Sequence, residues 1–276
     1  MKKLALYALL VLGLCLSAGD IIISSGPAEK SFIKMGDNLV TAVGTPNIKN
    51  MPSNGSIENI ENLITGKANV GFVFADTYKL KLSQDPRAEK LKVLGVLNKG
   101  CLYAVVKDGG KIKDDGDLET SGVTIDPGVK GAGATTTWEY LGMFDKDFKK
   151  PNVMNIGGGD PASLNALMFG TVDAVLSMQT PSTNNTLVKD VLAEKSLKFL
   201  PITDGDFTDK LADGRPIYTK EKILIAQGKG WSSDTKLETI CTDVLVLAND
   251  SLAAEDFRLL SAILYRNKAA VIGTTK

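Results

Sequence analysis

The chain has 276 residues, and its 32 basic and 32 acidic side chains give a net charge of zero. This balance argues against a nucleic acid as the partner, because nucleic-acid-binding proteins carry a basic surface. Apolar residues make up 43% of the chain, so a sizeable core is expected, and the lack of histidine excludes Ser-His-Asp triads, histidine metal sites and histidine bases.

The N-terminus has the pattern of a secretory signal peptide. Two lysines precede an apolar run over residues 4–16, which is too short to span a membrane as an ordinary helix. We therefore expect residues 1–18 to be removed and the mature chain to be periplasmic. Cys15 could suggest a lipoprotein anchor, but residues 12–14 place a bulky leucine where a small residue is needed, so this interpretation is less favoured.

The mature chain begins with a strand and a helix. Residues 21–23 are typical of a buried strand, and a turn at Ser25 and Gly26 leads into a helix that Gly44 ends. The apolar residues of this helix, starting with Phe32, recur at helical spacing. Phe32 could stack on a ligand near the turn, although an aromatic residue at this spacing is more often part of the core.

A loop of small polar residues, 53–56, precedes the second helix. We expect Ser56 to cap this helix and Gly66 to stop it, with an apolar strand over residues 70–75. Such a loop presents free backbone N–H groups, which hold polar or anionic ligand groups. Asp76 closes the strand and could accept a ligand ammonium or hydroxyl group, or could cap the next helix.

The next segment is predicted to contain a helix, two strands and Cys101, one of the two cysteines that follow the signal peptide. A helix over residues 80–91 precedes strands over 92–97 and 102–106, with a turn at residues 99–100. Cys101 and Cys241 each begin or precede an apolar strand, and they could pair if these strands lie side by side, which the sequence cannot decide. Neither resembles a catalytic thiol, since a cysteine nucleophile usually needs a histidine base.

A glycine-rich loop opens what resembles a second copy of the first unit. A strand over residues 123–125 leads through the loop 126–135 into a helix over 136–141, which Gly142 stops. The loop lacks the lysine of a P-loop and the third glycine of a dinucleotide fingerprint, so a nucleotide enzyme is weakly supported. Backbone N–H groups that hold a carboxylate fit the sequence better. The acidic residues 114–117 lack the spacing of a calcium loop.

The second helix of the first unit also has a counterpart. Asp160 opens a helix that Gly170 stops, with the spacing found between Ser56 and Gly66, and a strand over 172–178 follows. Any two αβ units can share glycine stops, but the agreement in detail favours a pseudo-repeat, with two similar lobes that face one cleft. A polar turn after this strand, with Gln179 and Pro181, could close the cleft.

The remaining chain returns toward the first lobe. We expect a helix over residues 187–192, a strand over 197–202, a loop-rich segment over 204–233 and a strand over 243–248. Ser251 is predicted to cap a final amphipathic helix. The whole pattern predicts an α/β clamshell, in which residues 19–106 plus 199–276 form lobe 1 and residues 107–198 form lobe 2. Closure of such lobes around a solute serves capture rather than chemistry.

Several of these segments together resemble the TAXI-type solute receptors of tripartite (TRAP) transporters. The similar segments cover most of the mature chain: N-G-S-I-E-N-I at 54–60, V-G-F-V at 70–73 before Asp76, the loop 131–135, Ser25 and Gly26 with Phe32 and Gly36, and Gly170, residues 172–174 and Pro181. The resemblance implies a type II periplasmic-binding-protein fold with two hinge crossings. It also implies delivery of a small, often carboxylate-bearing solute to a membrane permease.

The resemblance and the loops together give a set of candidate ligand-binding residues. They are Ser25, Gly26, Phe32, Asn54, Gly55, Ser56, Asp76, Gly131, Gly133, Ala134, Thr135, Gln179 and Pro181. Ala132 and Ala134 depart from the Gly-Ser-Gly-Thr turn of the family, so Thr135 is left as the hydroxyl there. We expect no catalytic residue, no cofactor and no metal, and a monomeric chain.

The ligand and the partner are less well defined by the sequence. No arginine lies in a candidate loop, so a bidentate carboxylate clamp is not visible, and we favour a small organic acid or amino acid. The receptor of an ABC importer has the same fold and is an alternative. An exported enzyme is a second alternative, for which Asp76 and Asp126 are the titratable candidates. A sensory role on the same fold also stays open.

Overall fold

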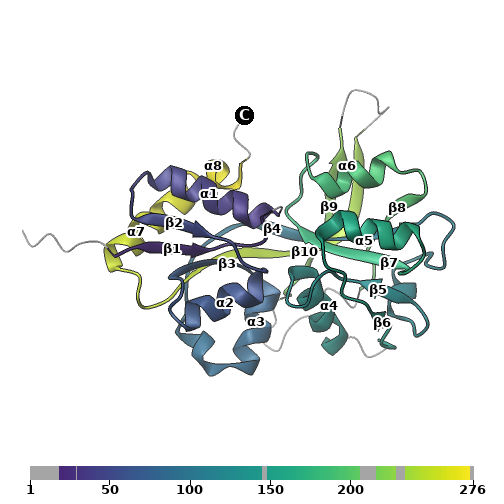
Figure 1. The fold of residues 1–276 in the computed structure, drawn as a ribbon, viewed down its shortest axis with the longest axis horizontal. Helices are drawn as coiled ribbons and strands as arrows, with labels where there is room; N and C mark the ends of the chain where they lie inside the picture. The colour runs from purple at the N-terminus through teal and green to yellow at the C-terminus, as the bar shows by residue number, and fades with distance from the viewer. Residues whose placement is uncertain (1–18, 29, 145–147, 206–215, 228–233, 274–276) are drawn as a thin grey trace, which may run out of the picture.

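The computed structural model describes residues 19–28, 30–144, 148–205, 216–227 and 234–273. These residues form one ten-stranded mixed sheet with helices on both faces (Figure 1). The predicted signal peptide, residues 1–18, lies outside the described residues. Within the described ranges, no helix is both long and apolar enough to cross a membrane.

Strands and helices alternate along most of the chain. The strands are β1 (Ile21–Ser24), β2 (Ile48–Met51), β3 (Val70–Phe74), β4 (Lys92–Lys107), β5 (Thr124–Asp126), β6 (Asn152–Val153), β7 (Ala174–Gln179), β8 (Leu197–Leu200), β9 (Thr219–Ala226) and β10 (Thr235–Ala248). The helices are α1 (Ser31–Val43), α2 (Ser56–Ile64), α3 (Ala75–Gln84), α4 (Gly133–Phe144), α5 (Gly159–Met168), α6 (Thr186–Ala193), α7 (Ala254–Arg266) and α8 (Lys268–Ile272), with the 3₁₀ turns η1 (Pro86–Lys90) and η2 (Gly116–Glu119).

The strand order, β2-β1-β3-β10-β4-β7-β5-β6, places two copies of one unit on either side of two central strands. β1 pairs in parallel with β2 and β3, and β5 pairs in parallel with β6 and β7. We call β1–β3 with α1–α3 the β1 side, and β5–β7 with α4–α6 the β5 side. Gly66 and Gly170 follow α2 and α5 with φ of 73° and 75°, a conformation that glycine adopts without strain. The predicted pseudo-repeat is confirmed.

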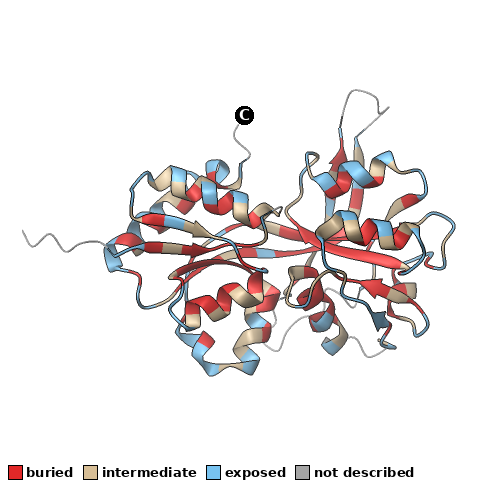
Figure 2. Cartoon of the chain, in the orientation of Figure 1, coloured by how far each residue is buried: buried red, intermediate tan, exposed pale blue. Residues whose placement is uncertain are grey.

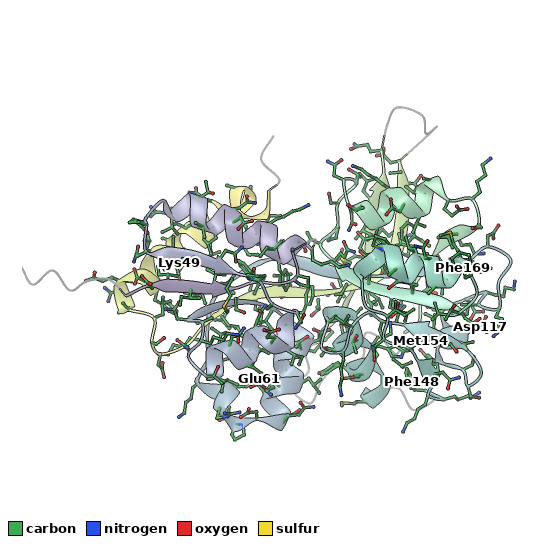
Figure 3. All side chains as sticks on the ribbon, viewed as in Figure 1. Lys49, Glu61, Asp117, Phe148, Met154 and Phe169 are labelled. Carbon is green, nitrogen blue, oxygen red and sulfur yellow. A yellow bond between two sulfur atoms is a disulfide. The ribbon has the colours of Figure 1, made fainter. Side chains whose placement is uncertain are left out.

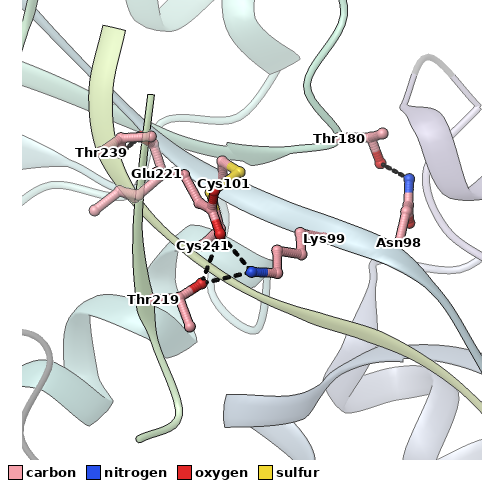
Figure 4. Close-up of a disulfide and its surroundings, with 9 residues drawn as sticks. Asn98, Lys99, Cys101, Thr180, Thr219, Glu221, Thr239 and Cys241 are labelled. Atoms are coloured by element: carbon pink, nitrogen blue, oxygen red, sulfur yellow. Dashed lines mark hydrogen bonds and ion pairs between the residues drawn. A yellow bond between two sulfur atoms is a disulfide. The ribbon is translucent and has the colours of Figure 1, made fainter. Parts of the chain in front are cut away.

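The central strands β4 and β10 run antiparallel between the two sides and change partners on the way. β10 pairs with β9 up to Cys241 and with β3 from Val244 onward, while β4 pairs with β7 from Cys101 onward. Cys101 and Cys241 face each other in this ladder and form a disulfide (Figure 4). Beside it, Nζ of Lys99 lies 2.5 Å from a carboxylate oxygen of Glu221. The disulfide therefore joins the two strands where they cross between the sides.

The hydrophobic core extends through both sides. β1, β3, β5 and β7 are buried along most of their length, whereas the outer faces of the helices are exposed (Figure 2). One buried cluster includes Phe32 and Phe74 from the β1 side and Trp138 from α4. The rings of Phe32 and Phe74 lie 4.7 Å apart between centroids. The two sides thus share packed apolar surface in addition to the crossing strands.

Residues 92–107 form one strand, so the two strands and the turn predicted there are wrong. Gly100 pairs with Thr242 inside the ladder between β4 and β10. A Cβ at Gly100 would lie 2.1 Å from the Phe74 ring, so this glycine allows the ring to approach the backbone and makes no turn. The predicted loop-rich segment, 204–233, contains β9, while residues 206–215 and 228–233 lie outside the described residues.

The predicted helix caps are also wrong. α2 begins after Gly55, and the Ser56 hydroxyl accepts a hydrogen bond from the Phe74 N–H in place of capping. α5 begins after Gly158, which has φ of 93°, and Asp160 lies in the first turn. α7 likewise begins after Ala253, two residues beyond the predicted cap. Glycines with positive φ turn the chain into α2 and α5, which the cap pattern does not reveal.

Two helices differ in extent from the prediction. The single helix expected over residues 80–91 is divided into α3 and η1, because Pro86 cannot continue an α-helix. α4 starts before the expected range 136–141 and continues through Gly142. A Cβ at Gly142 would lie 3.1 Å from the Phe148 ring, so this glycine also provides room for an aromatic side chain and does not end the helix.

Candidate functional site

A cavity of about 390 Å³ lies between the β1 side and the β5 side. Its walls are the loops that follow β1, β2, β5 and β6, together with residues of β3 and β7. Ligands of open α/β sheets bind at the carboxyl ends of the strands, where such loops gather. Here two sets of these loops face each other across one space.

Four helices begin at this cavity. The first residues of α1, α2, α4 and α5, which are Ser31, Ser56, Gly133 and Gly159, all line it. The start of a helix carries N–H groups without intrahelical partners and the positive end of the helix dipole. The cavity is therefore electrostatically suited to an anionic group such as a carboxylate.

An ion pair joins the two sides across the cavity. Nζ of Lys30, the residue before α1, lies 2.6 Å from Oδ2 of Asp160 in the first turn of α5. The same carboxylate accepts hydrogen bonds from Ser177 (3.1 Å) and Gln179 (2.7 Å) on β7. The Lys30 and Asp160 side chains are 29% and 18% exposed, so both charges lie near the cavity with partial access to water. The site thus offers a cation and an anion side by side.

The rest of the cavity wall is largely apolar. Phe32 and Phe74 line it from the β1 side, and Ile156, Leu176 and Met178 line it from the β5 side. Apolar walls with a few placed polar groups are typical of small-molecule sites. The polar groups would orient a solute, and the walls would cover its carbon skeleton.

A buried hydrogen-bond network fixes the loops of the β1 side. Asn59 on α2 is fully buried and accepts hydrogen bonds from the hydroxyls of Ser24 and Ser53, each at 2.6 Å. Its amide nitrogen donates to the backbone oxygens of Ser25 (2.5 Å) and Phe72 (2.7 Å). One side chain therefore ties the loops after β1 and β2 to β3. The sequence analysis assigned no role to Asn59. A polar residue on the buried face of an amphipathic helix is the signal that could have identified it.

The sequence profile of the NMT1-like family matches residues 25–275, which is most of the chain. The chain belongs to the NMT1-like family. A comparison with curated protein sequences gave no significant match.

Solved structures share the fold of this NMT1-like chain at low sequence identity. A substrate-binding protein of an amino acid ABC transporter is 14% identical with a TM-score of 0.51, and the alignment covers 91% of this chain and 96% of that one. The GluR0 ligand-binding core from Nostoc punctiforme, in complex with L-glutamate, is 14% identical with a TM-score of 0.52, covering 91% and 95%. A TctC solute-binding protein from Polaromonas is 15% identical with a TM-score of 0.53, covering 94% and 88%. These likenesses confirm the predicted two-lobed, type II periplasmic-binding-protein fold.

The structure brings part of the predicted site to the cavity. The lining includes Phe32, Asn54, Gly55, Ser56, Gly133 and Ala134. Ser25, Gly26 and Gly131 lie in the same loops, and Thr135 lies in the first turn of α4, but all four are outside the lining. Gln179 lines a second cavity of about 460 Å³ that shares Ser31 and Asp160 with the first. Among the described residues, Asp76 and Pro181 line neither cavity. The binding roles of all these residues stay predictions.

The two hydroxyls expected to contact a ligand have backbone partners in the NMT1-like chain. Ser56 Oγ accepts from the Phe74 N–H at 3.1 Å. Thr135 Oγ1 donates to the carbonyl oxygens of Pro127 (3.0 Å) and Val129 (2.9 Å). Both hydroxyls therefore hold the loops in shape. Lys30 and Asp160, which do extend to the cavity, were not predicted as site residues, because their proximity depends on how the two sides face each other.

Neither carboxylate considered for catalysis lines the cavity. Burial raises the pKa of Asp76, and hydrogen bonds from Thr137 and Tyr218 oppose this rise. Asp126 is fully buried, and its Oδ1 accepts from the N–H groups of Gly128 (2.8 Å) and Ile156 (3.2 Å). In the part of the chain that the structure describes, no cluster of three or more His, Cys, Asp or Glu is placed to hold a metal ion.

Proposed function

We propose that this protein is an extracytoplasmic solute-binding protein that holds a small solute in the cavity between its two lobes. One observation carries this proposal: two pseudo-symmetric sides direct four helix starts and an ion pair into a single, largely apolar cavity. The lobe boundaries predicted above, with residues 19–106 and 199–276 in lobe 1 and 107–198 in lobe 2, are part of the proposal. Closure of these lobes would enclose the solute.

We infer that the solute is a small organic acid or an amino acid. The helix starts favour a carboxylate, and Lys30 supplies a cation for it. Asp160 can accept hydrogen bonds from an ammonium group. Phe32, Phe74 and Met178 supply apolar cover for a short side chain. Two of the structurally similar proteins, an amino acid ABC transporter's binding protein and a core holding L-glutamate, accord with this class.

The bound solute would be delivered to a TRAP-type membrane permease, with the chain acting as a periplasmic monomer of the TAXI type after removal of residues 1–18. The resemblance of residues 54–60 and 131–135 to that family supports this choice. Each proposed lobe also exposes a large apolar side chain, Tyr265 on α7 in lobe 1 (87% exposed) and Phe169 in lobe 2 (85% exposed; Figure 3), which suits contact with a partner. Delivery to an ABC importer is the alternative, and a neighbouring permease gene distinguishes the two.

A thermal-shift screen tests the proposal. The purified chain is heated with simple carboxylates, amino acids and neutral solutes in separate samples. A solute present at a hundredfold its dissociation constant stabilises the folded state by about 2.7 kcal/mol, which shifts the melting temperature by several degrees. We expect a selective shift with one acid or amino acid. No shift with any of them would contradict this ligand class, and turnover of a bound compound would favour the exported enzyme.

The ion pair provides a matched set of variants for the same screen. Asp160→Asn removes the anion and keeps the side-chain shape, and Lys30→Met removes the cation and keeps an unbranched chain. For an amino acid ligand, both variants should reduce the shift. For a simple carboxylate, Lys30→Met should reduce the ligand-induced shift. Asp160→Asn should leave this shift unchanged or increase it, because the variant removes a negative charge beside the ligand. Lys49→Met, far from the cavity on β2, serves as the control.

A further inference from the structure

Asp76 lies behind the cavity and joins the two sides of the molecule. It is fully buried in the first turn of α3, two residues after Phe74, which lines the cavity. Its Oδ1 atom stays within α3 and accepts from the N–H of Thr77 at 2.6 Å. Its Oδ2 atom accepts from the hydroxyls of Thr137 on α4 (2.5 Å) and of Tyr218 (2.8 Å), which precedes β9. One carboxylate thus contacts three separate elements.

Neutral donors alone hold this carboxylate. Among the described residues, the groups that act on Asp76 are the hydroxyls of Thr77, Thr137 and Tyr218 and one backbone N–H, and none is a cation. The Tyr140 ring of α4 packs edge-on against the Tyr218 ring, with 6.1 Å between centroids. A buried carboxylate without a cation depends on each of its donors. Separation of α3 from α4 therefore requires the Thr137 hydroxyl to be replaced by water.

The contact between Asp76 and Thr137 also positions a wall of the cavity. Thr137 lies one turn beyond Gly133 and Ala134, which line the cavity. A Cβ at Gly133 would lie 2.5 Å from the Phe74 ring, so the first turn of α4 touches this ring. Phe74 and Gly133 belong to opposite walls. The distance between Asp76 and Thr137 therefore fixes how closely these walls approach.

We propose that Asp76, Thr137 and Tyr218 form a latch that positions the first turn of α4 against Phe74 and so sets the width of the cavity. Asp76 acts through α4, as a positioning residue, and does not touch the solute. The latch itself requires only the fold. Its consequence for solute capture rests on the proposed function. The cavity-lining residues Gly133 and Ala134 of α4 are thereby held in place from outside the cavity.

A pair of substitutions that remove only hydroxyls tests the latch. Thr137→Val and Tyr218→Phe together delete both donors to Oδ2 with little change in side-chain size. We expect a larger radius of gyration in small-angle X-ray scattering. We also expect the amides of residues 133–144 to exchange hydrogen faster, by on the order of tenfold or more. This factor corresponds to the free energy of one hydrogen bond to a charged group. Unfolding should stay cooperative.

Two matched controls separate positioning from general loss of stability. Thr137→Ser keeps the hydroxyl and should leave both measurements at their wild-type values. Thr77→Val removes a hydroxyl that donates to the other oxygen of Asp76, at 3.2 Å, from within α3. It should lower stability without changing the radius of gyration or the exchange of α4.

An unchanged radius of gyration and unchanged exchange in the double variant would overturn the proposal. If the double variant does not fold, Tyr218→Phe alone is compared with Thr77→Val, since each removes one hydroxyl from the same carboxylate. The latch predicts faster exchange in α4 for Tyr218→Phe only, and equal exchange would overturn it. Neither measurement uses a solute, so failure of the latch and failure of the solute-binding proposal are separate results.

Discussion

Replacing Asn59 by alanine should destabilise the fold by about 4 kcal/mol, since a typical buried hydrogen bond contributes about 1 kcal/mol net. The Asn59 amide makes four buried hydrogen bonds, to the hydroxyls of Ser24 and Ser53 and to the backbone oxygens of Ser25 and Phe72. The loss is large beside the total stability of a domain, roughly 5–15 kcal/mol. Urea unfolding measures it as a lower midpoint at an unchanged slope.

Asn62→Ala is the matched control for this prediction. Asn62 has the same residue type on the same helix and is also buried, but its amide donates one hydrogen bond, to Ser24 at 2.9 Å. Both variants remove the same atoms, so the cost of the vacated volume is similar and largely cancels in the comparison. Asn59→Ala should therefore be less stable than Asn62→Ala by about 3 kcal/mol. Equal losses in the two variants would refute the reasoning.

Three further predictions concern the junction of the two sides. Reduction of the Cys101–Cys241 disulfide, whose cysteines are separated by 140 residues in sequence, should lower the free energy of unfolding by roughly 5 kcal/mol in denaturation curves with and without reductant. Gly133→Ala should cost about 1–3 kcal/mol because its Cβ would overlap the Phe74 ring, and Phe74→Leu in the same chain should recover part of this loss in a double-mutant cycle. Burial raises the pKa of Asp76, so the folded chain binds a proton on this carboxyl more tightly than the unfolded chain does. Protonation of Asp76 therefore stabilises the fold. This stabilisation is fully present below the ordinary pKa of an aspartate and is lost as pH rises through the raised pKa of the folded state. Asp76→Asn should weaken the dependence of the free energy of unfolding on pH, measured by urea unfolding at several acidic pH values. The same dependence on pH in the variant and the wild type would contradict this prediction.

The repeated architecture could be predicted from the sequence because its signals are local. Gly66 and Gly170 end their helices through backbone conformations that other residues adopt only with strain, and the apolar strands that follow are continuous in sequence. These features need no knowledge of distant contacts. The two-lobed α/β fold followed from the spacing of such units alone.

The errors arise where a residue serves a distant partner. Gly100 has the composition of a turn, yet it lies in the middle of β4 because the Phe74 ring occupies the space of its missing side chain. A polar residue on the buried face of α2 signals that Asn59 has partners, but the sequence does not identify them, since all four lie outside that helix. The ion pair of Lys30 and Asp160 exists only because the two sides face each other. Each of these features needs the register of elements far apart in the chain.

The way the two sides face each other also accounts for the charge of the cavity. Each side directs two helix starts to the carboxyl edge of its parallel strands, and the mirrored strand order brings these edges together. The resulting positive field favours an anion, while Lys30 is already paired with Asp160. A simple carboxylate that takes Lys30 leaves Asp160 beside it without a cation, which costs free energy in a partly buried site. An amino acid supplies both charges and leaves neither side chain unpaired. On this argument the cavity should bind an amino acid more tightly than the corresponding acid without the amino group, and the reverse order in the thermal-shift screen would show that the ion pair stays intact beside the ligand.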